Sequence, residues 1–192
     1  MKKGAEILTS FGRRPASGTP PDLEARLRRV RLFLCDVDGV LTDGTVFMAG
    51  ETEAKQFNIL DGLGLRFLQR EGIKVGWVSG RASPATTQRA KDLRIDFLSQ
   101  GSHEKVPEIE KILGQAGVGW DQLCYVGDDV LDLGALKRAG LAVAVANAIA
   151  ECQALAHYVT RNSGGRGAIR EVVDLILKAQ GRWEALVKDY SR

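Results

Sequence analysis

Residues 32–39 read Leu-Phe-Leu-Cys-Asp-Val-Asp-Gly, and this stretch indicates which fold the chain adopts. Its first four residues are apolar without alternation, which is typical of a strand buried on both faces of a parallel sheet. Two carboxylates and a glycine follow directly, where the strand must end. Because ligands of parallel α/β sheets bind beyond the carboxyl ends of the strands, the stretch predicts a buried strand with a polar site at its end.

The rest of the chain repeats this strand pattern and alternates it with helical patterns. Apolar runs predict strands at residues 31–35, 74–78, 97–98, 123–126, 141–145 and 158–159. Amphipathic periodicity and capping residues predict helices at residues 22–29, 61–70, 84–93, 105–116, 131–139 and 168–179. Residues 45–58 interrupt the alternation and resemble a small β-hairpin. We therefore predict an α/β fold, a three-layer Rossmann-like parallel sheet with a hairpin inserted after the first strand.

The 192 residues carry a net charge of +3 that is distributed unevenly. Residues 1–31 hold eight Lys or Arg against three Asp or Glu, whereas the remainder is slightly acidic. An acidic body argues against nucleic acid as a partner. We expect residues 1–29 to form a basic flexible leader, residues 30–183 to form one domain and residues 184–192 to form a tail.

The composition also indicates whether the protein enters a membrane and in which redox compartment it occurs. The most apolar window, residues 141–150, has about half the length that a membrane helix needs. The three cysteines form no CxxC pair, and with the two histidines they make no zinc pattern. These features predict a cytoplasmic protein that has no membrane partner.

Reactive side chains follow the predicted strands or open a helix near them: Asp36, Asp38, Asp128, Asp129, Ser79 and Lys105. Crowded carboxylates repel one another unless a cation lies among them, and carboxylate oxygens suit Mg²⁺. A hydroxyl and an ammonium can donate to phosphate oxygens. One aspartate can then attack phosphorus while another transfers protons. The set predicts phosphate-ester chemistry that depends on Mg²⁺.

Each of these features also has a structural explanation when it is taken singly. The aspartates at 36 and 38 could form a turn, and those at 128 and 129 could cap a helix. Ser79 could be a turn residue and Lys105 a solvated side chain. Their occurrence together, each in register with a strand end, favours a shared site.

The same residues resemble the haloacid dehalogenase superfamily of phosphatases, whose signature elements occur here in order: Asp36–Thr42, Ser79, Lys105 and Gly127–Asp129. This resemblance implies that Asp36 is the nucleophile and Asp38 the general acid/base. It further implies that Ser79 and Lys105 hold the phosphoryl group. The implied Mg²⁺ ligands are Asp36, the main-chain oxygen of Asp38, and Asp128, with Asp129 assisting.

Closer similarity is to the branch of this superfamily that hydrolyses 3-deoxy-D-manno-octulosonate 8-phosphate, a sugar-acid phosphate whose product is used for lipopolysaccharide. Its motifs stand at residues 36–44 (DVDGVLTDG), 55–64 (KQFNILDGLG), 79–81 (SGR), 125–129 (YVGDD) and 158–171 (YVTRNSGGRGAIRE). Two alternatives stay open. One is a phosphatase of a nine-carbon sialic-type sugar acid 9-phosphate, and the other is a non-catalytic phosphate-binding or regulatory subunit.

The intervals between the motifs leave no room for a cap domain. The 43 positions from Asp36 to Ser79 hold only the hairpin and one helix, and 23 positions separate Lys105 from Asp128. A bare site must obtain its specificity elsewhere. We expect Lys55, Arg81 and Arg166 to bind the sugar-acid carboxylate, because cationic side chains pair with carboxylates.

The resemblance implies a homotetramer in which the hairpins meet around a common axis and residues 164–167 cover an adjacent site. Two alternatives from the residues alone stay open: the hairpin packs on its own domain, and the glycines form a flexible linker. We also expect deletion of everything after Asn162 to raise KM or alter kcat while leaving the chemistry of Asp36 possible.

Overall fold

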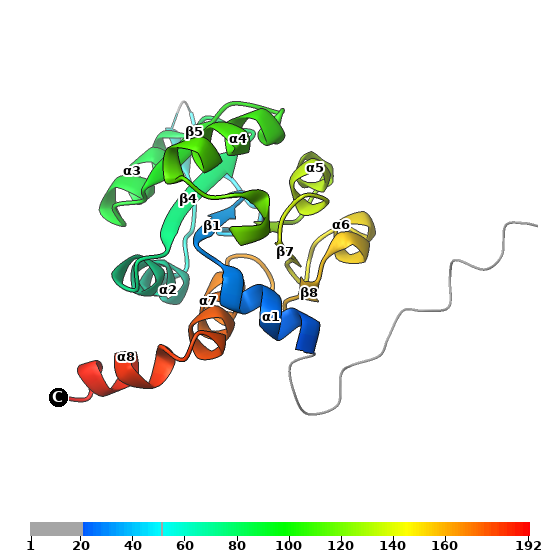
Figure 1. Ribbon diagram of the computed structural model, residues 1–192. Helices are drawn as coiled ribbons and strands as arrows, with labels where there is room; N and C mark the ends of the chain where they lie inside the picture. Colours follow the sequence, from blue (N-terminus) through cyan, green and yellow to red (C-terminus); the bar gives the residue numbers. More distant parts are fainter. Residues whose placement is uncertain (1–20, 51) are drawn as a thin grey trace, which may run out of the picture.

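A six-stranded parallel sheet forms the centre of the molecule (Figure 1). The computed structural model describes residues 21–50 and 52–192. In order across the sheet the strands are β5 (Phe97–Gln100), β4 (Lys74–Ser79), β1 (Leu32–Cys35), β6 (Leu123–Gly127), β7 (Leu141–Ala144) and β8 (Tyr158–Val159). The predicted α/β fold is confirmed, and each predicted strand lies within two residues of its observed bounds.

Helices lie on both sides of this sheet, which gives three layers. They are α1 (Pro21–Arg29), α2 (Ile59–Arg70), α3 (Pro84–Asp92), α4 (Lys105–Ala116), α5 (Leu133–Leu136), α6 (Ala150–Leu155), α7 (Ala168–Ala179) and α8 (Trp183–Tyr190). Helices α1 and α2 both pack against α7, whereas α5 contacts both α4 and α6. Helices α6 and α8 are additional to the helices predicted from the sequence.

The helix predicted over residues 131–139 is shorter in the structure. The chain first makes a 3-10 turn at Val130–Asp132, and α5 covers only Leu133–Leu136. The turn is stabilised because a carboxylate oxygen of Asp132 accepts hydrogen bonds from the amides of Asp128 and Asp129, which lie four and three residues earlier in the chain. Periodicity alone does not reveal such a bond.

The predicted hairpin is present as β2 (Phe47–Ala49) and β3 (Thr52–Ala54), which pair antiparallel. Its strands are exposed or half-buried throughout. The hairpin forms a separate two-stranded sheet and does not join the main sheet.

The observed body extends beyond the expected boundaries at both ends. Leu23 and Leu27 of α1 belong to the hydrophobic core, although the sequence analysis placed them in a leader. Leu186 of α8 is 2% exposed, although it was expected in a tail. The first 20 residues of the predicted leader lie outside the described residues.

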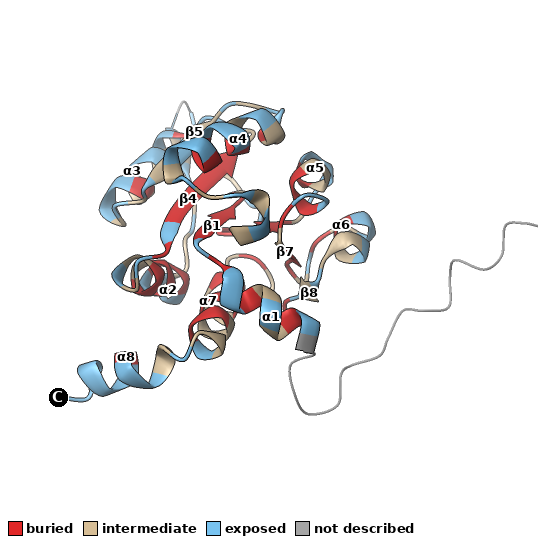
Figure 2. Ribbon diagram, in the orientation of Figure 1, coloured by how far each residue is buried: buried red, intermediate tan, exposed pale blue. Residues whose placement is uncertain are grey.

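The register of the central strands positions the site. Cys35, the last residue of β1, lies between Trp77 of β4 and Val126 of β6. All three strands are buried along nearly their whole length, as Figure 2 shows for β1 and β4. Because they pair in parallel, their carboxyl ends lie at the same edge of the sheet. In the part of the chain that the structure describes, no helix is long and apolar enough to cross a membrane.

Candidate active site

The loop after β1 is tightly folded and carries the first two aspartates. The carbonyl of Val37 accepts hydrogen bonds from the amides of Leu41 and Thr42, which turns the chain back over the strand end. Gly39 has φ of +91°, and a Cβ there would lie 2.0 Å from a carboxylate oxygen of Asp128. Only glycine allows this close approach.

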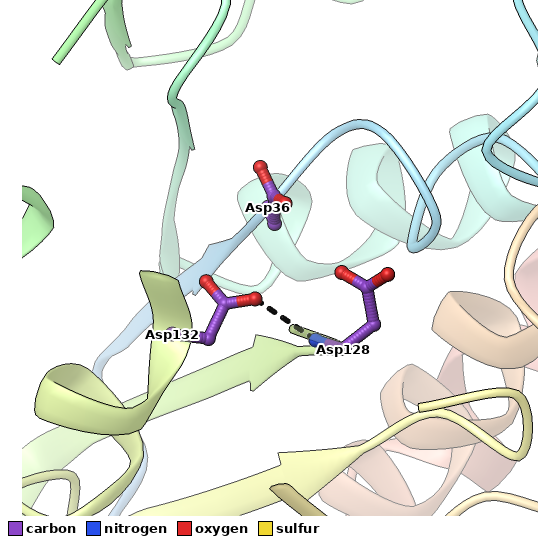
Figure 3. Close-up of side chains that lie close together, drawn as sticks. All are labelled: Asp36, Asp128 and Asp132. Atoms are coloured by element: carbon purple, nitrogen blue, oxygen red, sulfur yellow. Dashed lines mark hydrogen bonds between the residues drawn. The ribbon is translucent and has the colours of Figure 1, made fainter. Parts of the chain in front are cut away.

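Three carboxylates meet at this edge of the sheet. One oxygen from each of Asp36, Asp128 and Asp132 lies within 4.8 Å of the others (Figure 3). Asp36 comes from the end of β1, and Asp128 follows β6. Asp132 reaches in from the 3-10 turn and is fully buried. The predicted meeting of Asp36 and Asp128 is therefore observed.

Lys105 at the start of α4 is the cation of this cluster. Its Nζ lies 2.7 Å from Asp132 and 3.0 Å from Asp36. Burial alone would lower the pKa of Lys105, but the carboxylates of Asp132 and Asp36 outweigh burial and raise it. The ammonium therefore stays charged beside the acids. Tyr125 Oη donates a further hydrogen bond of 2.6 Å to Asp132.

The arrangement of these acids suits a divalent cation. Burial and the charge of Asp132 raise the pKa of Asp36 to about 6, although Lys105 opposes them. Burial and the charges of Asp36 and Asp132 raise the pKa of Asp128 to about 8. Among the described residues no hydrogen-bond donor reaches the buried Oδ1 of Asp128. A cation at this point would satisfy that oxygen and reverse both pKa shifts.

Ser79 is the last residue of β4, the strand next to β1, and is 1% exposed. Its Oγ accepts a hydrogen bond from the amide of Arg81, which leaves the hydroxyl hydrogen able to donate. Its place at the carboxyl end of the strand beside β1 fits the expected phosphate contact.

Asp38 pairs with Lys55, the residue that follows β3 of the hairpin. The Nζ of Lys55 lies 2.7 Å from one oxygen of Asp38 and donates a hydrogen bond of 3.0 Å to the other. Arg81 approaches Asp38 to 4.0 Å and pairs with Glu53 at 2.7 Å. The Lys55 side chain is completely covered, whereas that of Arg81 is 48% exposed.

Two predicted residues lie away from the cluster. Asp129 is exposed, and its carboxylate accepts a hydrogen bond from the Val130 amide, as a capping residue does. Arg166 is 62% exposed and pairs with Asp43 at 3.3 Å. The structure therefore does not bring the side chains of these two residues to the carboxylates.

Asp132 is the site residue that the sequence analysis missed. Its spacing four residues after Asp128 was available as a signal, but residues 131–139 were interpreted as a regular helix. The fold turns Asp132 inward because its carboxylate is the acceptor for Lys105, Tyr125 and two amides.

The glycine-rich segment packs on the catalytic loop of its own chain. Gly165 donates a backbone hydrogen bond of 3.0 Å to Val40, and Gly164 donates one of 2.7 Å to the Asn147 side chain. Asn147 in turn donates to the carbonyl of Gly39. The segment is a brace for the loop, so the alternative of a flexible linker is wrong.

Buried carboxylates with a paired ammonium and a hydroxyl, at the carboxyl edge of a parallel sheet, form a site that suits phosphoryl transfer. The comparisons with known proteins identify the class as hydrolases. Residues 85–172 match the haloacid dehalogenase-like hydrolase family. The chain is also 42% identical, over 96% of each chain, to the 3-deoxy-D-manno-octulosonate 8-phosphate phosphatase KdsC of Yersinia pestis.

Solved structures give the same result. A probable YrbI family phosphatase from Pseudomonas syringae is 42% identical, with a TM-score of 0.86 over 89% of this chain and 98% of that chain. A second structure, with a TM-score of 0.86 and 36% identity, is the 3-deoxy-D-manno-octulosonate 8-phosphate phosphatase from Moraxella catarrhalis in complex with magnesium, phosphate and KDO. It covers 88% of this chain and 98% of that chain. The chain belongs to the haloacid dehalogenase-like hydrolases and, within them, to the family of these phosphatases.

Proposed function

We propose that this protein is a Mg²⁺-dependent phosphomonoesterase that hydrolyses 3-deoxy-D-manno-octulosonate 8-phosphate to the free sugar acid and phosphate. The observation that carries the proposal is the convergence of Asp36, Asp128 and Lys105 at one sheet edge. The magnesium, phosphate and KDO found together in the Moraxella catarrhalis relative support the same ligands here.

The residues divide the reaction into two steps. A carboxylate oxygen of Asp36 forms a bond to phosphorus while the bond from phosphorus to the sugar oxygen breaks. Asp38 gives its proton to that leaving oxygen. In the second step Asp38 takes a proton from water, which attacks the aspartyl phosphate and releases phosphate from Asp36.

The phosphoryl group and the cation take the remaining groups of the site. Ser79 donates its hydroxyl hydrogen to a phosphoryl oxygen, and Lys105 offers the N–H that its two carboxylate partners leave free. Mg²⁺, when bound by Asp36, Asp128 and the main-chain oxygen of Asp38, neutralises charge on the phosphoryl oxygens. Asp129 assists through its amide, which holds Asp132.

Arg81 and Arg166 are the residues that we propose for the sugar-acid carboxylate. The half-exposed guanidinium of Arg81 lies at the rim beside Asp38, which supports this role. Arg166 is exposed on the brace next to the catalytic loop. Lys55 was predicted for the same task, but its complete burial against Asp38 argues against direct contact with substrate.

We propose further that the protein assembles as a homotetramer through its hairpins. Phe47 and Met48 on β2 are 57% and 64% exposed, and Ile59 at the start of α2 is 78% exposed. Large apolar side chains exposed on the hairpin and at the start of α2 support a contact surface there. The expected cover of an adjacent site by residues 164–167 has no such support, because this segment packs on the loop of its own chain.

The environment that fits these features is the cytoplasm. All three cysteines of the sequence are buried and unpaired in the structure, which agrees with a reducing compartment.

The test is turnover of a panel of sugar phosphates by the purified protein with Mg²⁺. We expect phosphate release from the eight-carbon sugar-acid ester and no turnover by Asp36→Asn. The ratio of kcat/KM for the eight-carbon and nine-carbon esters decides between the two substrates. Binding of Mg²⁺ and phosphate without turnover of any ester would instead identify a non-catalytic binding subunit.

A further inference from the structure

Lys55, the residue that follows β3 of the hairpin, contacts the carboxyl group of Asp38. The Nζ of Lys55 lies within 3.0 Å of both carboxylate oxygens of Asp38. A carboxyl group held at both oxygens cannot rotate about its last bond without losing one contact. The Lys55 side chain is 0% exposed, so water does not compete for the ammonium.

Lys55 is itself fixed from two sides. Its Nζ donates a hydrogen bond of 3.2 Å to Thr86, a fully buried residue in the first turn of α3. Glu53 lies on β3, two residues before Lys55, and one of its carboxylate oxygens is 3.7 Å from the same nitrogen. Glu53 also accepts hydrogen bonds from Ser83 and Arg81, which join β3 to the start of α3. The ammonium is therefore held by the body and by the hairpin.

The chemistry of Asp38 requires this kind of support. The same carboxyl must face the leaving oxygen in the first step and the attacking water in the second. General acid–base catalysis contributes about 10²–10⁴ to a rate, and it does so only where the group is placed within hydrogen-bond reach.

We propose that Lys55 is a positioning residue, which orients the Asp38 carboxyl toward the leaving oxygen and so makes the hairpin part of the catalytic machinery of its own chain. This inference rests on the proposed role of Asp38 in the phosphatase reaction. It replaces the expectation that Lys55 binds the carboxylate of the substrate.

Lys55→Met tests the proposal, because methionine keeps most of the length and removes the ammonium. Three esters are compared: the sugar-acid phosphate, a neutral sugar phosphate and p-nitrophenyl phosphate. The first two release alkoxides that need a proton, whereas nitrophenolate leaves without one. We expect kcat/KM to fall about 10²-fold for both sugar esters and less than about threefold for p-nitrophenyl phosphate.

Two outcomes overturn the proposal. An equal loss for all three esters means that Lys55 supports the fold only. A loss confined to the sugar acid means that Lys55 binds its carboxylate. Lys74→Met is the matched control, since Lys74 forms a surface pair with Asp96 and its side chain is 59% exposed; it should leave all three values unchanged.

A second variant covers the case in which Lys55→Met does not fold. Thr86→Val removes only the hydroxyl that holds the ammonium, and we expect a smaller loss with the same preference for sugar esters. A wild-type protein that hydrolyses only the neutral esters contradicts the proposed substrate but leaves the Lys55 comparison intact. A wild-type protein that hydrolyses no ester overturns both.

Discussion

Asp132 connects the ammonium of Lys105 to the carboxylates of the site. One of its oxygens accepts from Lys105 and Tyr125, and the other accepts from two backbone amides. These four donors satisfy both oxygens of a carboxylate that is buried away from water. Asp132 therefore holds Lys105 at the distance from which Lys105 also reaches Asp36.

Asp132→Asn should show this role. The amide keeps the shape of the side chain but removes the charge that pairs with Lys105. We expect activity or Mg²⁺ affinity to fall about 10- to 100-fold, as is usual when a residue that orients a metal site is lost. Steady-state rates over a Mg²⁺ titration measure both quantities.

Asp129→Asn is the comparison for that experiment, because Asp129 is exposed and caps the turn. We expect a much smaller loss. A loss as large as that of Asp132→Asn would show that Asp129 belongs to the metal site after all.

The raised pKa of Asp128 predicts a pH dependence. A carboxyl whose pKa is about 8 in the folded state and lower when unfolded binds its proton more tightly in the folded state. The metal-free protein should therefore lose stability as pH rises toward 8, through the range between the unfolded and folded pKa values.

Mg²⁺ must displace this proton, so its apparent affinity should rise with pH up to about 8. The increase should approach about tenfold per pH unit for one released proton. Thermal unfolding with and without Mg²⁺, from about pH 6 to about pH 9, measures both effects. A Mg²⁺ affinity that is constant over this range would contradict the prediction.

At the scale of elements, the glycine-rich brace and the loop after β1 form one unit. A Cβ on Gly164 would lie 1.8 Å from the carbonyl oxygen of Gly39. The brace is also tied to α2, because the buried carboxylate of Asp61 accepts hydrogen bonds from the amides of Gly167 and Arg170. The loop that carries the nucleophile is therefore supported by a segment more than one hundred residues further along the chain.

Gly164→Ala should disturb this unit. The added methyl group must push the brace from the loop, and we expect a loss of about 1–3 kcal/mol in the free energy of unfolding, with lower turnover. Gly114→Ala in α4 is the control, because its Cβ would meet open space and alanine favours a helix by roughly 0.5–1 kcal/mol. Urea unfolding distinguishes the two variants, and equal stability would contradict the brace.

At the scale of the whole molecule, α7 belongs to the core. Val172, Val173, Ile176 and Leu177 of this helix are at most 1% exposed, and the helix contacts both α1 and α2. Deletion after Asn162 would therefore remove part of the core, so we expect loss of the fold in place of the altered kinetics expected from the sequence. Such a truncation should fail to fold, which circular dichroism of the purified fragment would detect.

The exposed apolar surface of the hairpin leads to a prediction about assembly. Met48→Lys adds a charge to β2 at a position that is 64% exposed, so the fold of one chain should be unchanged. If the hairpins form the tetramer interface, light scattering should give a smaller species. A variant with the mass of the wild type would show that assembly uses another surface.

The strand ends, the hairpin and the class of chemistry were predictable from the order of residues. An apolar run predicts a buried strand, and in a parallel sheet the residues that follow the strands lie at one edge. For that reason the sequence alone placed Asp36, Ser79 and Asp128 together.

The partners of the site's acids were decided by the tertiary structure. Asp132 lies inward because a 3-10 turn replaces the expected helix, and Lys55 lies on Asp38 because the hairpin folds back against the start of α3. Periodicity along a chain indicates the type of element and its buried face. Two side chains from distant elements meet only when both elements are packed in one position and both side chains adopt one rotamer. That choice is made by packing.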